Sequence, residues 1–493
     1  MSDYLRRLVR SLAAYQVADV VSKFMAVLLL PVYTRYIGPS GYSTVEVLAN
    51  SVIFVSILAR FGIIEAFLRF HFSDEDTARR DALARRAMAF LLATTTAVAV
   101  VLAAFAGPLS HVVLRHRDAG TFLVAVLGLW AFTNLELAYG LLRVDERVRA
   151  YAAASLCNVG LTIAASVVLV VALHQGPRGL LLGNYGASTV VLAALWWTMR
   201  DRLRPRRGAV AERLGVLLRF GLPTVPAEAS VYALSLIDRY WLLYSRGRAD
   251  VGLYSIAIKL AGTVAFIVRA FQYAWPPLAY SVRDDREAAR VYSLVTTYYV
   301  FVSGWVVAAL ALLGRWILRL LAAPSFYGAH TALTWVSLGW ACYGLWVVLL
   351  VIAGRAKVTT RNFPASLAGL AANLVLLALL IGPLGITGAG LALCGAYVVM
   401  LAVMHLLTRS AFAVAFEWAR LARVAVVFGG LAAAGELLLP THGVLGLLTR
   451  LALVALLPAA LALTGFFHAE ELRFARAALA RARARGARGE AGA

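Results

Sequence analysis

Apolar runs long enough to cross a lipid bilayer recur along most of this chain, and they constrain its fold more than any other feature. A bilayer core about 30 Å thick needs roughly 20 apolar residues for each helical crossing, and runs of this length repeat from the N-terminus to about residue 467. Because 62% of the 493 residues are hydrophobic, the chain has more apolar surface than a soluble core can bury. The sequence therefore predicts an all-α, polytopic membrane protein.

Charged loops divide the apolar sequence into about fourteen predicted transmembrane helices, with boundaries good to about four residues. These helices cover 12–33, 42–68, 87–107, 119–142, 151–173, 179–199, 214–243, 251–280, 291–314, 329–353, 362–382, 386–408, 421–440 and 444–467. The loops between them are at most about 20 residues long, which leaves no room for a soluble catalytic domain. We therefore expect no catalytic residues and no enzymatic activity.

The charged residues and cysteines exclude several other classes of protein. The formal net charge is +22, from 47 basic and 25 acidic residues, but the arginines lie mostly in short loops between apolar runs, which indicates membrane topology and not nucleic-acid binding. Cys157, Cys342 and Cys394 lie far apart within apolar runs, without metal-ligand or redox spacing. We expect neither a metal site nor a cofactor.

Alternate loops differ strongly in their content of arginine. The rich loops contain, among others, Arg79, Arg147, Arg200, Arg283 and Arg355. Basic loops stay on the cytoplasmic side of a membrane, so both termini are predicted to be cytoplasmic. An even number of helices agrees with that orientation.

Two similar segments indicate an internal repeat. Tyr-Thr-Arg-Tyr at 33–36, followed by Gly-Tyr at 41–42, resembles Tyr-Ser-Arg-Gly at 244–247, followed by Gly-Leu-Tyr at 252–254. The offset spans six predicted helices, so both halves have the same orientation, as in transporters with parallel repeats and a substrate site between them. We predict a six-helix N-terminal lobe over 1–210, a six-helix C-terminal lobe over 211–410, two further helices over 411–470 and a basic cytoplasmic tail over 471–493.

Three segments carry a resemblance to a known family. They are 30–39 with Gly41 and Tyr42; 237–240 followed by 251–255 and Lys259; and Asn373 followed by 385–389. Together they resemble the polysaccharide biosynthesis and export family (Wzx-type flippases) of the MATE-like multidrug, oligosaccharidyl-lipid and polysaccharide exporter superfamily, over about residues 5–410.

This resemblance implies a fold, a substrate and a location. The fold would be a V-shaped bundle with a hydrated cavity, working by alternating access in the cell inner membrane. The cargo would be oligosaccharide units on undecaprenyl phosphate or pyrophosphate, supplied to surface polysaccharide, such as the O-antigen of lipopolysaccharide. The implied partners are this lipid-linked substrate, membrane lipid, H⁺ or Na⁺, and other polysaccharide-assembly proteins.

Basic residues inside the predicted helices are candidates for binding the anionic headgroup. A charge in hydrocarbon is costly, so such groups usually face a partner or a watery cavity. Arg60 and Arg269 fall at nearly equivalent positions of the two halves, and the arginine fork suits phosphate oxygens. With Lys259 and Lys23 they form the predicted headgroup set. A structural ion pair, or a side chain reaching the interface, is the alternative for each.

Acidic residues in the same helices are candidates for ion coupling, because a carboxylate inside a membrane can exchange protons. The predicted set is Asp19, Glu46 and Asp238. Asp19 also lies four residues before Lys23, on the same helix face, so the two can neutralise each other. Asp238 precedes Arg239, an arrangement that more often fixes a helix end.

Two other functions compete with the flippase prediction. A MATE-type cation-coupled multidrug antiporter would share the two-lobe fold but would favour an acidic cavity, whereas this core contains several basic residues. A membrane polysaccharide polymerase or glycosyltransferase generally needs a large outer loop with catalytic acids or arginines. The acidic clusters at 74–76 and 284–285 instead lie on the predicted cytoplasmic side.

Overall fold

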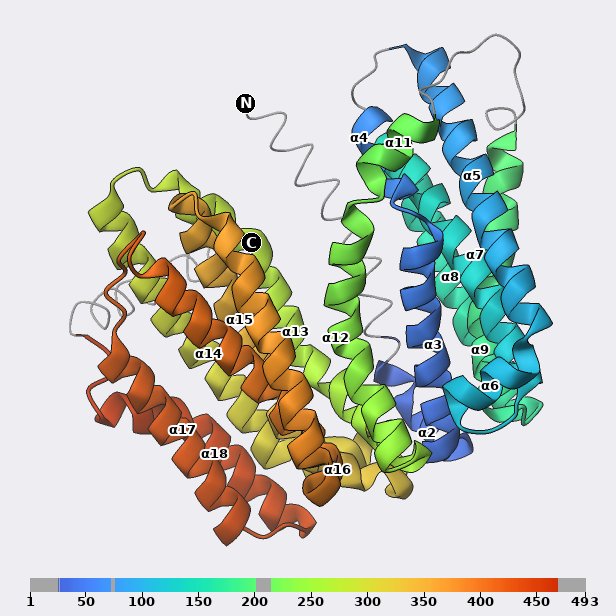
Figure 1. The fold of residues 1–493 in the computed structure, drawn as a ribbon. Coiled ribbons are helices and arrows are strands. Elements are labelled where there is room, and N and C mark those ends of the chain that lie inside the picture. The colour runs from blue at the N-terminus through green and yellow to red at the C-terminus, as the bar shows by residue number, and fades with distance from the viewer. Residues whose placement is uncertain (1–24, 26, 72–75, 201–213, 469–493) are drawn as a thin grey trace, which may run out of the picture. The chain divides into compact units, whose positions relative to one another are not determined.

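The computed structural model describes residues 25, 27–71, 76–200 and 214–468, which form helices and their connections without a strand (Figure 1). The helices are α2 Leu30–Tyr36, α3 Pro39–Ala59, α4 Ile63–His71, α5 Thr77–Ala104, α6 Ala106–Leu114, α7 Ala119–Val144, α8 Val148–Val167, α9 Gly176–Thr198, α11 Leu214–Gly221, α12 Thr224–Ser245, α13 Arg248–Ser281, α14 Asp285–Leu321, α15 His330–Arg355, α16 Asn362–Thr408, α17 Trp418–Leu438 and α18 Gly443–Leu463. A π-helical turn covers Val168–Ala172, and 3₁₀ turns cover Pro324–Ala329 and Thr359–Arg361.

Eleven helices of the described chain are long and apolar enough to cross a membrane, so the prediction of an all-α polytopic membrane protein is confirmed. α16 has 47 residues and a non-helical residue within it, Gly385, with φ 55° and ψ −128°. It therefore covers two predicted helices, 362–382 and 386–408. The number fourteen stays a prediction, because the first predicted helix lies mostly outside the described residues.

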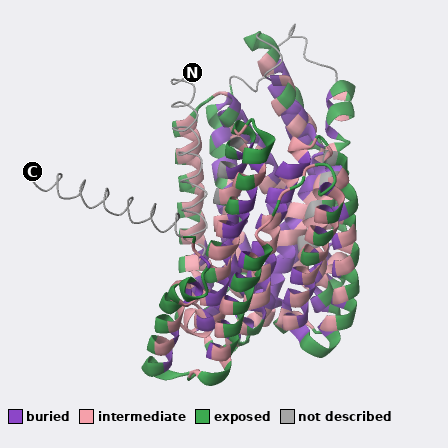
Figure 2. Cartoon of the chain, turned by 90° about the vertical axis from the view of Figure 1, so that its left-hand side faces the viewer, coloured by how far each residue is buried: buried purple, intermediate pink, exposed green. Residues whose placement is uncertain are grey.

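The surface exposes many apolar side chains, as expected for a protein surrounded by lipid. Figure 2 colours each residue by its burial. Many of the exposed side chains are large and apolar, including Trp197, Leu437 and Leu463. A soluble protein rarely exposes large contiguous apolar patches. The prediction of a membrane environment follows from this surface as well as from the helix lengths.

The chain divides into two compact units. The first contains the described residues up to Lys259 together with Leu318–Ala329 and Leu377–Ala389. Within it, α7 packs against α3, α5 and α9, and most of the α7 span is buried. A helix that is apolar on all sides belongs in a core, and α7 supplies Leu135, Ala138 and Leu141 to a core cluster of this unit.

Two predicted helices of the first unit are in fact broken, so the continuous helices expected over 42–68 and 214–243 are wrong. α3 ends and α4 begins around Phe61 and Gly62, which have φ values of 48° and 68°, and α11 is separated from α12 after Gly221. A Cβ atom on Gly62 would lie 2.1 Å from the carbonyl oxygen of Gly221. The two breaks thus pack backbone to backbone, which only glycine permits.

The second unit contains Leu260–Ile317, His330–Leu376 and the described residues from Gly390 onward. In it, α17 and α18 pack against α14 through a cluster that includes Leu312, Phe428, Leu457 and Phe466. The lobe boundaries predicted at residues 210, 410 and 470 stay predictions, and the predicted basic tail over 471–493 lies outside the described residues.

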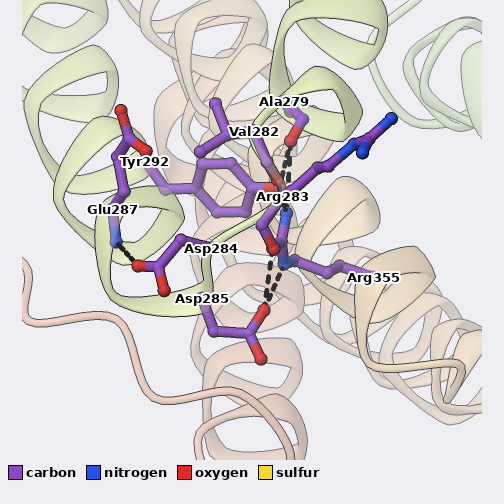
Figure 3. A network of polar contacts seen from close by, with 8 residues as sticks. All are labelled: Ala279, Val282, Arg283, Asp284, Asp285, Glu287, Tyr292 and Arg355. Carbon is purple, nitrogen blue, oxygen red and sulfur yellow. Dashed lines mark hydrogen bonds and ion pairs between the residues drawn. The ribbon is translucent and has the colours of Figure 1, made fainter.

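A structural arginine fixes the connection between α13 and α14 in the second unit (Figure 3). Arg355, the last residue of α15, donates from Nε and Nη2 to Oδ1 of Asp285, at 3.0 and 2.7 Å. It also donates to the backbone carbonyls of Val282 and Arg283, at 2.8 and 3.0 Å. All of these partners lie in or next to one loop, so Arg355 holds that loop to the end of α15.

Candidate functional site

Arg60 lies at the centre of a group of carboxylates in the first unit. Its Nη1 donates to Oε2 of Glu136 on α7 at 3.0 Å, and its Nη2 forms an ion pair with Oε1 of Glu228 on α12. Nη2 also lies 3.9 Å from Oε1 of Glu65 on α4. We call these four residues the Arg60 cluster. It joins four elements and contains three carboxylates for one guanidinium.

The members of the Arg60 cluster differ in exposure. The Arg60 side chain is 6% exposed, whereas the side chains of Glu65, Glu136 and Glu228 are 32%, 35% and 40% exposed. The guanidinium side chain is therefore more buried than the carboxylate side chains around it. Two buried atoms of the cluster, Nε of Arg60 and Oε2 of Glu65, have no hydrogen-bond partner among the described residues.

The local sequence explains why the Arg60 cluster forms where it does. Arg60 follows the last residue of α3, and the turn through Gly62 packs against Gly221, just before the start of α12, which carries Glu228. One turn earlier on α3, Ser56 accepts a hydrogen bond of 2.9 Å from Thr133 of α7. The paired breaks and this hydrogen bond bring α3, α7 and α12 together around the guanidinium.

A second ion pair in the first unit joins α3 to the beginning of α13. Nζ of Lys259 lies 2.6 Å from Oε1 of Glu46 and donates a hydrogen bond to the hydroxyl of Tyr42. The backbones approach closely here, because a Cβ atom on Gly252 would lie 2.1 Å from the carbonyl oxygen of Pro39. This pair is balanced, with one ammonium for one carboxylate.

A cavity of about 380 Å³ adjoins the Lys259–Glu46 pair, within the first unit. Its polar lining consists mainly of Tyr33, Tyr42, Glu46, Asn158, Asn184 and Lys259. The side chain of Lys259 is 37% exposed and that of Glu46 is 11% exposed. The cavity therefore presents hydrogen-bond donors and acceptors between membrane-spanning helices, with apolar side chains completing its wall.

The family model for "Polysaccharide biosynthesis protein" matches residues 8–279, a little over half of the chain. The chain belongs to this polysaccharide biosynthesis family. The matched segment contains the Arg60 cluster, the Lys259–Glu46 pair and the cavity. The comparison with curated protein sequences gave no match.

Solved structures similar to this polysaccharide biosynthesis protein are membrane transporters. The lipid II flippase MurJ, in an inward closed conformation, has a TM-score of 0.71 at 12% identity, covering 92% of this chain and 98% of that one. An inward-facing MATE family multidrug resistance transporter of the MOP superfamily has a TM-score of 0.62 at 15% identity, covering 82% and 98%. A MOP superfamily transporter from Pyrococcus furiosus has a TM-score of 0.53 at 12% identity, covering 84% and 93%. At these identities the likeness shows the fold alone, which is the predicted MATE-like one.

The structure brings some of the predicted residues together and separates others. Lys259 and Glu46, predicted for different roles, contact each other. Arg60 is in the first unit and its predicted counterpart Arg269, an exposed residue, is in the second, so their joint site stays a prediction. Lys23 and Asp19 lie outside the described residues.

Asp238, the third candidate for ion coupling, is buried on α12 and accepts a hydrogen bond of 3.1 Å from the hydroxyl of Tyr254. Its neighbourhood ties α12 to other elements, since Tyr232 donates to Asn50 of α3 at 2.9 Å. The hydrogen bond from Tyr254 to Asp238 joins α13 to α12. A role of Asp238 in ion coupling stays a prediction.

The partners of Arg60 were not predictable from the sequence. Glu136 and Glu228 are 76 and 168 positions away from Arg60 along the chain. The available signal was only that each is a carboxylate within a predicted transmembrane helix. Within the part of the chain that the structure describes, no group of three or more His, Cys, Asp or Glu side chains is arranged to hold a metal ion.

Proposed function

We propose that this protein is a flippase that translocates lipid-linked oligosaccharide units across the cytoplasmic membrane by alternating access. The carrier is undecaprenyl phosphate or pyrophosphate, and the product serves surface polysaccharide or O-antigen synthesis. The observation that carries the proposal is a polar cavity among the membrane-spanning helices of a polysaccharide biosynthesis family member. The fold shared with a lipid II flippase supports it.

The chemistry of the first unit suits a polar cargo with an anionic group. Ionisable groups inside a membrane protein usually mark the path of a substrate or an ion. A cavity of about 380 Å³ is within the range for small-molecule sites, and its amide and hydroxyl groups match the hydroxyls of a sugar.

The predicted residues keep proposed roles within this function. Arg60 and Lys259, with Arg269 and Lys23 as further members, bind the anionic headgroup. Glu46, Asp238 and Asp19 are proposed for coupling to H⁺ or Na⁺. Two six-helix lobes rock against each other, with both termini in the cytoplasm and other polysaccharide-assembly proteins as partners.

Complementation of a strain that lacks its oligosaccharide flippase tests the proposal. Expression of this chain should restore surface polysaccharide and should lower the amount of lipid-linked sugar on the inner leaflet. A polymerase-deficient strain is the control and should not be rescued. Normal membrane expression together with undiminished lipid-linked sugar on the inner leaflet would contradict the proposed function.

One observation favours a second candidate, a MATE-type cation-coupled multidrug antiporter. The Arg60 cluster has more carboxylates than cations, and such an excess attracts protons and cationic drugs. This candidate predicts efflux of ethidium from cells that express the chain, driven by a cation gradient. Dye efflux without rescue of the flippase-deficient strain would favour it over the flippase.

A further inference from the structure

We propose that Arg60 is an anion-binding site for a phosphate group. Glu136 and Glu228 contact the guanidinium nitrogens that the phosphate would contact, so phosphate binds only when these glutamates are protonated. The ligand class is a phosphate or pyrophosphate group, either on a lipid or free in solution. The inference rests on the proposed function only for the identity of the lipid carrier. The binding site itself is tested without transport.

The contacts of the guanidinium carry the first step. Glu136 occupies Nη1 at 3.0 Å and Glu228 occupies Nη2. An arginine binds phosphate through the same fork of N–H donors, usually with two parallel hydrogen bonds. Phosphate and the two carboxylates therefore compete for the same nitrogens. The remaining nitrogen, Nε, is buried without a partner in the described chain and is a free donor for an incoming anion.

The balance of charge carries the second step. The charges that act here are those of the Arg60 cluster, one guanidinium and three carboxylates, and that of Arg143 on α7, a second guanidinium outside the cluster. Three carboxylates against two guanidinium groups leave an excess of negative charge, which repels a phosphate dianion. The dianion can replace the carboxylates only after they lose their own charge. Proton uptake is thus required for the exchange.

The pattern of exposure carries the third step. Between 32% and 40% of each glutamate side chain is exposed, against 6% of the Arg60 side chain. The carboxylate side chains are therefore the more accessible members of the cluster, and we take them to receive the proton. A protonated glutamate loses its ion pair with Arg60, and its side chain can then rotate away from the guanidinium. The anion follows the proton into the site.

Thermodynamic linkage turns these steps into a measurable effect. If protons on Glu136 and Glu228 favour the bound anion, the anion raises the affinity for protons by the same factor. In a membrane with a proton gradient, this linkage makes headgroup binding dependent on pH. It gives the proposed flippase a coupling site made of Arg60, Glu136 and Glu228, none of which needs a metal ion.

Binding of inorganic sulfate to the purified full-length protein tests the inference, because sulfate stays a dianion at both pH values used. Ligand-induced thermal stabilisation is measured at about pH 5.5 and about pH 7.5, so that the proton concentration differs and the charge of sulfate does not. Wild-type protein should bind sulfate roughly tenfold more tightly at the lower pH, a change of about 1.4 kcal/mol. The Glu136→Gln/Glu228→Gln variant should bind with high affinity at both pH values.

Variants of arginine show where the sulfate binds. Arg60→Gln should bind no sulfate at either pH. Arg355→Gln, a control that removes the structural arginine at the end of α15, should bind sulfate like wild type. If Arg60→Gln does not fold, Arg60→Lys, which keeps the charge and loses the fork, should bind more weakly. If the double glutamine variant does not fold, Glu228→Gln alone should reduce the dependence on pH.

A second arm identifies the source of the phosphate. Farnesyl phosphate in detergent is compared with inorganic phosphate, and tighter binding of the former assigns the site to a lipid headgroup. Equal binding assigns it to free phosphate. Wild-type sulfate binding that ignores pH, unchanged binding by Arg60→Gln, or no binding by the double glutamine variant overturns the inference. Sulfate binding as predicted, in a protein that fails complementation, removes the proposed flippase function and leaves the anion site.

Discussion

Two groups of charged side chains in the first unit differ in one respect that separates their chemistry. The Arg60 cluster sets one guanidinium against three carboxylates, whereas Lys259 and Glu46 form a balanced pair beside a cavity. The balanced pair carries no net charge. The unbalanced cluster needs protons or cations to offset its negative charge. The ratio of positive to negative charges therefore distinguishes the Arg60 cluster from the Lys259–Glu46 pair.

The same contrast holds between Arg60 and Arg355. Arg355 donates chiefly to Asp285 and to carbonyl oxygens of the loop from α13 to α14 (Figure 3). Backbone carbonyls do not titrate, so among these partners only the Asp285 carboxylate can accept a proton. The partners of Arg60 are side chains that can accept protons and rotate. Arg355 therefore serves as the matched control for Arg60.

The largest effect is expected from removal of the cation at the centre of the cluster. Arg60→Ala leaves three carboxylates without a guanidinium, at a cost of about 2–3 kcal/mol, below the range for a fully buried pair because these carboxylates are between 32% and 40% exposed. The free energy of unfolding in detergent, measured by denaturation, should fall by this amount near neutral pH. The loss should be smaller at acidic pH, where the glutamates are protonated. An equal loss at both pH values would show that repulsion among the carboxylates is absent.

The next largest loss of stability is expected from substitution of the glycines that pack beside each group of charges. The two substitutions should differ in their effect on sulfate binding. Gly221→Val places side-chain atoms against the backbone at Gly62, and Gly252→Val does so against the backbone at Pro39. Such overpacking costs about 1–3 kcal/mol or more. Gly221→Val should abolish sulfate binding at Arg60, and Gly252→Val should leave it unchanged. Loss of sulfate binding in both variants would mean that the two regions act as one.

A smaller effect is expected at the balanced pair. Lys259→Met leaves the Glu46 carboxylate alone, at an expected cost of about 1–2 kcal/mol because Lys259 is partly exposed. The double variant Lys259→Met/Glu46→Gln should recover most of that loss, because it leaves no unpaired charge. Thermal denaturation of the three proteins measures this recovery. If the double variant is less stable than Lys259→Met, the Glu46 carboxylate stabilises the protein through contacts other than its ion pair with Lys259.

The smallest loss of stability is expected at Arg355, which holds the loop from α13 to α14 to the end of α15. Arg355→Lys keeps the positive charge beside Asp285 but loses the fork that reaches Val282 and Arg283. Its stability should fall by about 1 kcal/mol or less, and complementation of a flippase-deficient strain should be unchanged. A complete loss of complementation by this conservative variant would remove Arg355 as a structural control.

The positions of most helices were predictable, whereas the site was predictable only in part. Apolar runs fix helices such as α7 and α15 because length and hydropathy decide a membrane crossing. The breaks at Gly62 and Gly221 were missed, since each depends on the backbone of the other, far away in sequence. Local sequence does not reveal a long-range contact between glycines.

The same reason explains the outcome at the charged residues. Arg60, Lys259 and Glu46 could be selected as candidates because a charge within an apolar run is rare and costly. Their partners could not, because Glu136 and Glu228 approach Arg60 only through the packing of α3, α7 and α12. Lys259 and Glu46 were assigned to separate roles and proved to be neighbours.

Reconstitution into proteoliposomes measures the proposed translocation of lipid-linked oligosaccharide itself. Lipid-linked oligosaccharide is placed in both leaflets, and a sugar-binding lectin added outside reports how much of it becomes accessible over time. The wild-type protein should expose the inner-leaflet pool faster than protein-free vesicles, and Arg60→Lys should be slow while Arg355→Lys matches wild type. Equal rates for wild-type protein, Arg60→Lys and protein-free vesicles would contradict the account.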